Sequence, residues 1–284
     1  MKVTTPPLGE QTLISAFLDA ETAKIDELVA NQQQLIELLE EKRQAVISHA
    51  VTKGLNPDSP MKPSGVEWLG NVPAHWEVRT IAKASTKITN GYVGPTRDIL
   101  VEAGVPYIQA THIKSGRINF DDSYFVTQEW SHGHSKSILA EEDVLIVQTG
   151  AGTGDIGLVE KTEIGFNCHA LIIVAPDKSV LRGTFLAALL QSAYGQQKLE
   201  SIQTGAMHPH LNCGEVKFVE VPLPPLAEQA NIVSYIRKAA DQFDALAADA
   251  RRAIDLLQER RTALISAAVT GQIDVRGLAA LAAA

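Results

Sequence analysis

The chain has 284 residues, a net charge of −8 and an apolar fraction of 45%, so it can bury the core of one or two ordinary domains. Its start carries no basic stretch followed by an apolar run, and no window holds the roughly 18 uncharged apolar residues that would span a bilayer. We therefore expect a cytoplasmic protein without a membrane segment. The two cysteines, Cys168 and Cys213, lie far apart and argue against a disulfide framework or a structural zinc site.

The acidic balance argues against a protein that coats DNA over its whole surface. Residues 1–61 carry 5 Lys and Arg against 9 Asp and Glu, residues 62–222 carry 13 against 17, and residues 223–284 carry 7 against 7. No region is basic overall. If this chain binds DNA, it must use a local patch, or a partner must supply much of the phosphate contact.

The first predicted element is a long helix that follows Pro6-Pro7, since the residue before a proline avoids the helical region. Steps of three and four predict one apolar seam, which contains Ile25, Leu28, Gln32, Leu35, Leu39, Lys42 and Val46. Gly54 stands where a C-terminal glycine is expected. We assign residues 1–54 to a first helical region.

Residues 55–222 form the predicted middle domain. Its first part, residues 55–70, is rich in Pro, Ser and Gly and is typical of a linker. Val144–Val147 and Leu171–Val174 are short apolar runs typical of strands, and a helix is predicted from Phe185 to about Lys198. These patterns predict an α+β fold, with one strand-rich domain between two long helices that form an antiparallel coiled coil.

The middle domain holds many polar side chains that suit base edges and phosphates. The candidate DNA-binding residues, chosen by chemistry and by their predicted place in loops, are Lys87, Thr89, Asn90, Arg97, His112, Lys114, Arg117, His134, Lys136, His208, His210 and Asn212.

Three patterns in the same region resemble catalytic or metal-binding motifs. Gly152–Gly157 fits the dinucleotide pattern G-x-G-x-x-G, but strand-like residues follow it where a helix should begin, so we interpret it as a glycine-rich hairpin. The histidine pairs at 132/134 and 208/210 lack a third ligand at a convincing spacing, and Glu215-Val-Lys217 lacks the aspartate of a nuclease. We predict no catalytic residue and no metal site in this chain.

The last predicted element repeats the first at an offset of 218 residues. Positions 6–54 and 224–272 share 20 identities in 49, including polar residues such as Asp26/Asp244 and Arg43/Arg261. We assign residues 223–272 to a second helical region and residues 273–284 to a tail. The two seams predict a subunit or dimer interface made of Leu28, Leu35, Leu39, Val46, Leu246, Ala253, Leu257 and Leu264.

Several segments together carry a family resemblance over residues 3–272. They are the junction Val221–Gln229, the ending Arg260–Ile273, the segment Ser64–Val78, and Thr204-Gly205 with Pro209–Asn212. The chain resembles the DNA specificity subunits of type I restriction–modification systems. This resemblance implies that the chain is a non-catalytic subunit with no cofactor of its own. It also implies that the chain binds double-stranded DNA and that its helices dock methyltransferase subunits, which hold S-adenosylmethionine and methylate adenine. The third implied partner is a restriction subunit, which uses ATP and Mg²⁺.

The sequence departs from the family pattern, because it has one predicted target-recognition domain where two are usual. It resembles the second half of a full subunit together with the central helix. We expect a two-fold homodimer of such chains or pairing with a different half-subunit. A truncated chain, or a helical adaptor whose middle domain binds protein, stays open as an alternative.

Overall fold

The computed structural model describes residues 5–121, 123–205 and 209–276, and His208 therefore lies outside the described residues. Two long helices dominate: α1 (Leu8–Lys53) and α6 (Leu226–Val269). The chain divides into two compact units, and both boundaries between the units fall within these long helices. We call residues 1–43 with 239–284 the helical unit, and residues 44–238 the sheet unit. Within the described residues no helix is long and apolar enough to cross a membrane.

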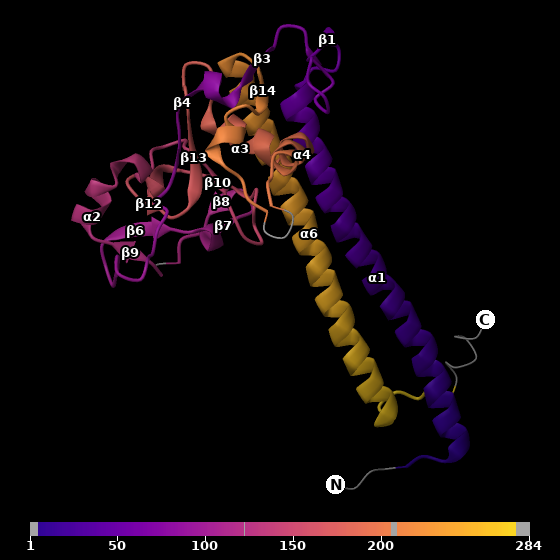
Figure 1. Cartoon of the computed structure of the whole chain (residues 1–284). Helices are drawn as coiled ribbons and strands as arrows, with labels where there is room; N and C mark the ends of the chain where they lie inside the picture. The colour runs from indigo at the N-terminus through magenta and orange to yellow at the C-terminus, as the bar shows by residue number, and fades with distance from the viewer. Residues whose placement is uncertain (1–4, 122, 206–208, 277–284) are drawn as a thin grey trace. The chain divides into compact units, whose positions relative to one another are not determined.

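In the helical unit, α1 and α6 run side by side in opposite directions (Figure 1). Two ion pairs fix the direction: Arg43 with Asp244, at 2.6 Å, and Arg261 with Asp26, at 3.0 Å. Where the start of α1 meets the end of α6, Phe17, Ala268 and Val275 form a small apolar cluster. The predicted antiparallel pair of helices is therefore confirmed.

The inward seam differs from the predicted one at alternate positions. Leu28, Leu35 and Leu246 are 48%, 42% and 51% exposed, so their prediction as seam residues between the two helices is wrong. The partly or fully buried positions in steps of three and four are Ile25, Val29, Gln32, Ile36, Leu39, Arg43 and Val46 on α1, and Phe243, Ala247, Ala250, Ile254, Leu257, Arg261 and Leu264 on α6. The apolar pattern is compatible with two heptad registers, which share every second position. The sequence analysis chose one register, and the packed helices use the second. Ala253, also predicted on the seam, is half-buried.

The sheet unit is built around a four-stranded antiparallel sheet in the order β11-β10-β13-β4. Its strands are β4 (Ser85–Asn90), β10 (Val144–Val147), β11 (Ile156–Leu158) and β13 (Leu171–Pro176). The two apolar runs predicted as strands are the buried strands β10 and β13. The G-x-G-x-x-G segment lies in the turn and second strand of the β10–β11 hairpin, which confirms the glycine-rich hairpin and excludes the helix that a dinucleotide site needs.

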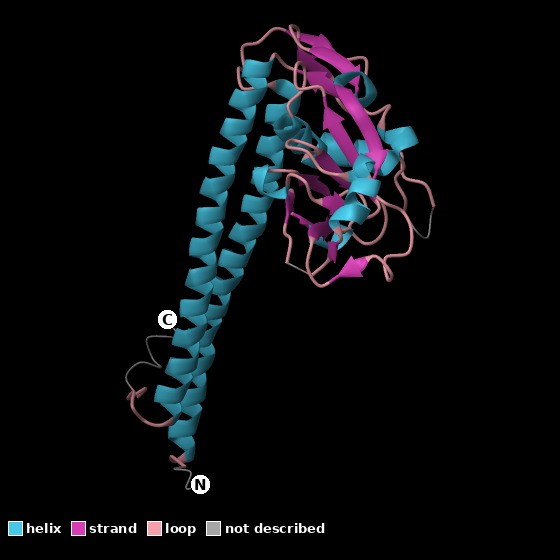
Figure 2. Cartoon of the chain, turned by 90° about the vertical axis from the view of Figure 1, so that its left-hand side faces the viewer, coloured by secondary structure: helices cyan, strands magenta, loops and turns pink. Residues whose placement is uncertain are grey.

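A second sheet has the order β12-β6-β9-β5, and three two-stranded pairs complete the unit (Figure 2). The second sheet contains β5 (Leu100–Val101), β6 (Val105–Ile108), β9 (Phe125–Val126) and β12 (Asn167–Cys168). The pairs are β1 (Met61–Pro63) with β2 (Asn71–Pro73), β3 (Glu77–Thr80) with β14 (Glu220–Leu223), and β7 (Ile113–Lys114) with β8 (Arg117–Ile118).

Short helices fill the connections. They are the α-helices α2 (Gln128–Gly133), α3 (Gly183–Gln191), α4 (Ala193–Ser201) and α5 (Cys213–Val216), and the 3-10 helices η1 (Ile81–Ala84), η2 (Ala110–His112), η3 (Ser135–Ser137) and η4 (Lys161–Glu163). The single helix predicted from Phe185 to Lys198 is two helices, because Ser192 takes an extended backbone and accepts a hydrogen bond from the Gly195 amide as the N-cap of α4.

The ends of the long helices complete the core of the sheet unit. Ala50 and Val51 from α1 and Ile232 from α6 are 1%, 0% and 0% exposed and belong to its main apolar cluster. Gln229, also fully buried, donates to the carbonyls of Val180 and Pro224 and accepts from the Arg182 amide. The end of α1 and the start of α6 are therefore part of the sheet unit's own core.

Candidate nucleic-acid interface

Three lysines from different parts of the sheet unit gather near the edge strand β4. Lys87 on β4 and Lys217, just after α5, line one hollow of about 350 Å³. Lys87 Nζ donates to the Lys136 carbonyl at 3.3 Å, which brings η3 to the same edge. We call Lys87, Lys136 and Lys217 the lysine cluster. It is a local positive patch on an acidic chain, as phosphate binding would need.

Two hydroxyl groups and one carboxyl group lie close to the lysine cluster. Ser85 and Thr86 line the same hollow, and the buried Ser85 hydroxyl has no hydrogen-bond partner among the described residues. The Thr86 hydroxyl donates to the Ala175 carbonyl at 3.2 Å. One carboxyl group, that of Asp143, is also close enough to interact with Lys87; burial raises its pKa, while Lys87 and Lys178 act in the opposite direction. Because the Ser85 hydroxyl is buried and the Thr86 hydroxyl already donates within the protein, the lysine ammonium groups are the donors left here for phosphate oxygens.

Thr89 and Asn90, two further predicted contact residues, continue strand β4 beside the cluster. Both are half-buried and pair with β13, at Ile173 and Ile172. The Asn90 Oδ1 accepts a hydrogen bond from the Cys213 thiol at 2.9 Å, so this oxygen is already used within the protein. The structure therefore joins Lys87 to Lys136 and places Asn90 against Cys213 of the same hollow, while Thr89 only shares strand β4 with Lys87.

Lys114 and Arg117 stand on a separate tight hairpin. They pair directly across β7 and β8, and both side chains are exposed. Ser115 and Gly116, with φ of 52° and 80°, form the turn, which suits a two-residue hairpin loop. The positive φ of Gly116 favours glycine, and a Cβ there would also require the end of the Gln191 side chain to shift. The short β7–β8 hairpin therefore carries two exposed, positively charged side chains.

His112 was predicted to contact DNA, and this prediction is wrong for the structure as it stands. Its ring is 3% exposed. One ring nitrogen accepts from the Gln109 amide at 3.0 Å, and the other lies 3.2 Å from Asp121 and 3.1 Å from the Ser123 hydroxyl. The hydrogen bond from Ser123 and the nearby His112 ring lower the pKa of Asp121. His112 therefore holds a loop together from inside.

His134 is half-buried and also makes structural contacts. Its ring stacks on Trp130 with centroids 4.0 Å apart, and its Nδ1 lies 2.8 Å from the Trp130 carbonyl. Tyr92 and Tyr107 pack edge-on against Trp130 in the same aromatic group. The sequence alone could not show this, because a histidine among polar residues looks the same whether its ring is stacked or free.

The remaining candidates are spread over loops. Arg97 is exposed between β4 and β5. His210 forms bridges with Thr149 and Thr204, and Asn212 Oδ1 accepts from the Glu215 amide at 3.0 Å as the N-cap of α5. Asn212 adjoins Cys213 and Gly214, which line the hollow beside Lys87 and Lys217, whereas Arg97 and His210 are not among the residues that line it.

Lys217 is the contact candidate that the sequence analysis missed. It appeared there only within the Glu215-Val-Lys217 pattern, which was set aside as a nuclease motif. Its meeting with Lys87 joins positions 130 residues apart, which no local pattern can reveal. Across the described parts of the chain, no group of three or more His, Cys, Asp or Glu side chains is placed to hold a metal ion.

Comparison with known proteins gives the family. The model of the type I restriction modification DNA specificity domain matches residues 73–253. The specificity subunit of the type I restriction enzyme EcoBI from Escherichia coli is 26% identical over 277 residues, which are 94% of this chain and 57% of that protein. A putative MjaX specificity subunit from Methanocaldococcus jannaschii is 25% identical and covers 97% of this chain and 60% of its own length.

Solved structures agree in fold. A chain from a structural study of complex assembly in the type I restriction–modification system matches with a TM-score of 0.69 at 18% identity, over 94% of this chain and 60% of that one. The HsdS subunit from Thermoanaerobacter tengcongensis matches with a TM-score of 0.53 at 18% identity, over 95% and 60%.

The fold is therefore mixed α and β, with a strand-rich unit and two long antiparallel helices. The chain belongs to the type I restriction modification DNA specificity family. It spans about three fifths of the length of the curated relatives it matches.

Proposed function

We propose that this chain reads a DNA sequence for a type I restriction–modification complex and carries out no chemistry itself. The observation that carries the proposal is the lysine cluster, a positive patch assembled from three separated segments on a chain with a net charge of −8. Family membership over residues 73–253 supports the same role for the sheet unit. In this proposal the lysines contact phosphates, and nearby polar side chains read base edges.

The partners in this proposal are double-stranded DNA, adenine methyltransferase subunits and a restriction subunit, in the cytoplasm. S-adenosylmethionine would bind to the methyltransferase, and ATP with Mg²⁺ to the restriction subunit. The exposed leucines Leu28, Leu35 and Leu246 are the predicted interface residues that remain free for another subunit. The other five, Leu39, Val46, Ala253, Leu257 and Leu264, are half-buried on the helix pair.

A split recognition site needs two reading domains, and this chain has one sheet unit. A two-fold dimer of these chains would supply the second and would read an inverted repeat. A different second half would give an asymmetric site. A helical adaptor that binds only protein would recognise neither a symmetric nor an asymmetric DNA site.

The test is co-purification with the methyltransferase subunit, followed by sequencing of methylated adenines in DNA exposed to the complex. We expect methylation at a split motif that disappears when this chain is left out. A two-fold symmetric motif supports the dimer, and an asymmetric one supports a different second half. Association without motif-specific methylation would reject the DNA-reading role and favour the adaptor.

A further inference from the structure

Phe218 is a large apolar residue that the structure leaves open to solvent beside the lysine cluster. It is 60% exposed. It directly follows Lys217, whose Nζ lies over the Phe218 ring, 4.7 Å from the ring centroid. Because Lys217 lines the hollow of the lysine cluster, the Phe218 ring stands at the margin of the proposed phosphate contacts.

The backbone around Phe218 is fixed, so the ring is held outward. Val216 and Val219, on either side in the sequence, are 0% and 3% exposed and belong to the main apolar cluster. The Phe218 amide donates to the Glu215 carbonyl at 2.9 Å, and the Val219 carbonyl accepts from the Ile81 amide at 2.8 Å. With both neighbours anchored in the core, the Phe218 side chain is presented to solvent on a firm support.

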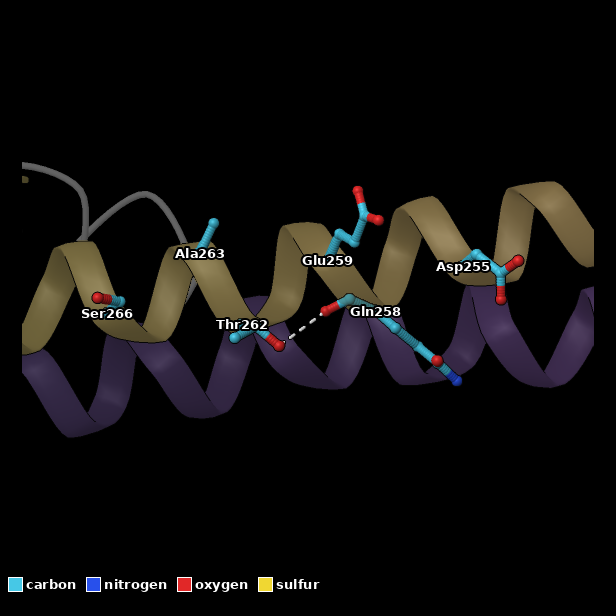
Figure 3. A pocket seen from close by; sticks show the side chains of 6 residues that line it. All are labelled: Asp255, Gln258, Glu259, Thr262, Ala263 and Ser266. Atoms are coloured by element: carbon cyan, nitrogen blue, oxygen red, sulfur yellow. Dashed lines mark hydrogen bonds between the residues drawn. The ribbon is translucent and has the colours of Figure 1, made fainter.

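The charge around the lysine cluster suits DNA, whereas that around a larger hollow on α6 does not. The described residues that line the hollow of the lysine cluster include Lys87 and Lys217 and no carboxylate. The hollow on α6, of about 660 Å³, carries the side chains of Asp255 and Glu259 (Figure 3). Their negative charges would repel phosphates. Phe218 therefore lies beside a surface that DNA can approach.

Trp68 provides an internal comparison for Phe218. It is 53% exposed, and Lys198 Nζ lies over its ring, 5.3 Å from the centroid. This pair stands among carboxylates, because Lys198 is ion-paired with Glu220 at 3.3 Å and Trp68 shares a hollow with Glu200. The two exposed aromatic rings thus have the same kind of cation contact in surroundings of different charge.

Lys217 limits where on a duplex the Phe218 ring can lie. A charge-assisted hydrogen bond is about 2.8 Å long, so a phosphate oxygen bound to Lys217 lies within about 8 Å of the ring centroid. The ring must then face the groove wall next to that phosphate. The apolar group that base edges offer in the major groove is the C5-methyl group of thymine, and phenylalanine is among the side chains that contact it.

Resting on the proposed function, we propose that Phe218 is a specificity-determining residue, whose ring packs against the C5-methyl group of a thymine in the recognised sequence. Lys217 binds a phosphate beside that thymine. Two neighbouring residues thereby combine a contact that positions the duplex with a contact that reads a base.

The test uses the complex of the full chain with the methyltransferase subunit, and a duplex that contains the methylated motif. Each thymine of the motif, on either strand, is replaced singly by deoxyuridine, which lacks the C5-methyl group and keeps the base pairing. The motif contains thymine because each methylated adenine pairs with one. Fluorescence anisotropy gives the affinity of each duplex for the original chain and for F218A.

We expect deoxyuridine at one thymine of a half-site to weaken binding of the original chain about fourfold, which is the effect of leaving one methyl group unburied. F218A should bind the thymine and deoxyuridine duplexes equally at that position. F218L, which keeps an apolar side chain, should retain part of the preference. W68A should retain all of it. K217A should weaken both duplexes alike, since its phosphate contact does not depend on the base.

Two results would overturn this proposal alone. One is a motif at which no deoxyuridine weakens binding of the original chain. The other is a deoxyuridine effect that is equally large in F218A and in the original chain. Both require a chain that binds its motif, whereas a complex that binds no motif would overturn the DNA-reading role as well. Thermal unfolding checks the variant, and F218A should match the original chain because Phe218 is mostly exposed.

Discussion

Arg43 Nη1 lies 2.6 Å from Asp244 Oδ1, and the repeat reproduces this contact elsewhere in the helical unit. Adding 218 to Arg43 gives Arg261, subtracting 218 from Asp244 gives Asp26, and Arg261 Nε lies 3.0 Å from Asp26 Oδ1. The two helices are therefore related by an internal two-fold axis, with each copy supplying one arginine and one aspartate. This symmetry lets matched positions act as controls for one another.

The mirrored ion pairs should contribute equally and weakly. Their side chains are 41% and 62% exposed in one pair and 42% and 59% in the other, so water screens both. We expect R43A and R261A each to lower the free energy of unfolding by about 0.2–1 kcal/mol, less at high salt. Urea unfolding at two salt concentrations measures this, with R251A on an exposed position of α6 as control. Double-mutant cycles with D244A and D26A that give no coupling would contradict it.

Val51 and Val269 form the sharpest matched pair for stability. V51A removes two buried carbon atoms from the core of the sheet unit, and we expect it to cost about 2 kcal/mol. V269A acts on a side chain that is 55% exposed, so its change should stay within about 0.5 kcal/mol. Urea unfolding of both variants gives the comparison. Equal losses would mean that Val269 is already covered in solution.

The repeat, the long helices and the strands β10 and β13 could be predicted because their signals are local or periodic. The helix seam could only be half predicted. Leu28 and Val29, like Leu35 and Ile36, are adjacent apolar residues, and either member of each pair completes a heptad. Only packing against α6 shows that Val29 and Ile36 face inward.

The candidate site was predicted unevenly for a related reason. Lys87 and Lys136 are polar residues in plausible loops or strand edges, and the structure brings them together. Lys217 was missed because its neighbour Lys87 is distant in sequence. His112 was wrongly placed at the surface, because a ring held by Gln109, Asp121 and Ser123 looks in sequence like any other histidine in a polar segment.

The lysine cluster should act through phosphates and so show in the salt dependence of binding. We expect K87A and K217A each to weaken DNA binding for all sequences alike and to reduce the slope of log affinity against log salt by about 1. Fluorescence anisotropy with the methylated motif and a scrambled duplex, at several salt concentrations, measures both effects. K161A, on η4 outside the cluster, is the matched control. An unchanged slope in K87A and K217A would remove these lysines from the interface.

His112 should matter for stability and leave the recognised sequence unchanged. Removing the buried ring leaves a cavity and leaves the half-buried Gln109 amide without its acceptor, so H112A should cost about 1–3 kcal/mol. Thermal unfolding and sequencing of methylated adenines measure the two properties. H132A changes an exposed ring on α2 and should be close to neutral in stability. A changed motif in H112A with unchanged stability would return His112 to the DNA-contacting set.

Cys168 should make the protein less stable in alkali. Its thiol is fully buried, and burial raises its pKa from 9.0 to about 12. Because the folded pKa lies above the unfolded one, the stabilising effect is complete below pH 9 and is lost as the pH rises toward 12. Within that range one such group lowers the free energy of unfolding by about 1.4 kcal/mol per pH unit. Urea unfolding between pH 8.5 and 10.5 should therefore give a shallower decline for C168A than for the original chain. Burial also raises the pKa values of the Tyr107 and Tyr194 hydroxyls, and Cys168 adds to the rise for Tyr107, so C168A also removes that part of the decline. Parallel declines would show that the Cys168 thiol ionises as easily in the folded protein as in the unfolded chain.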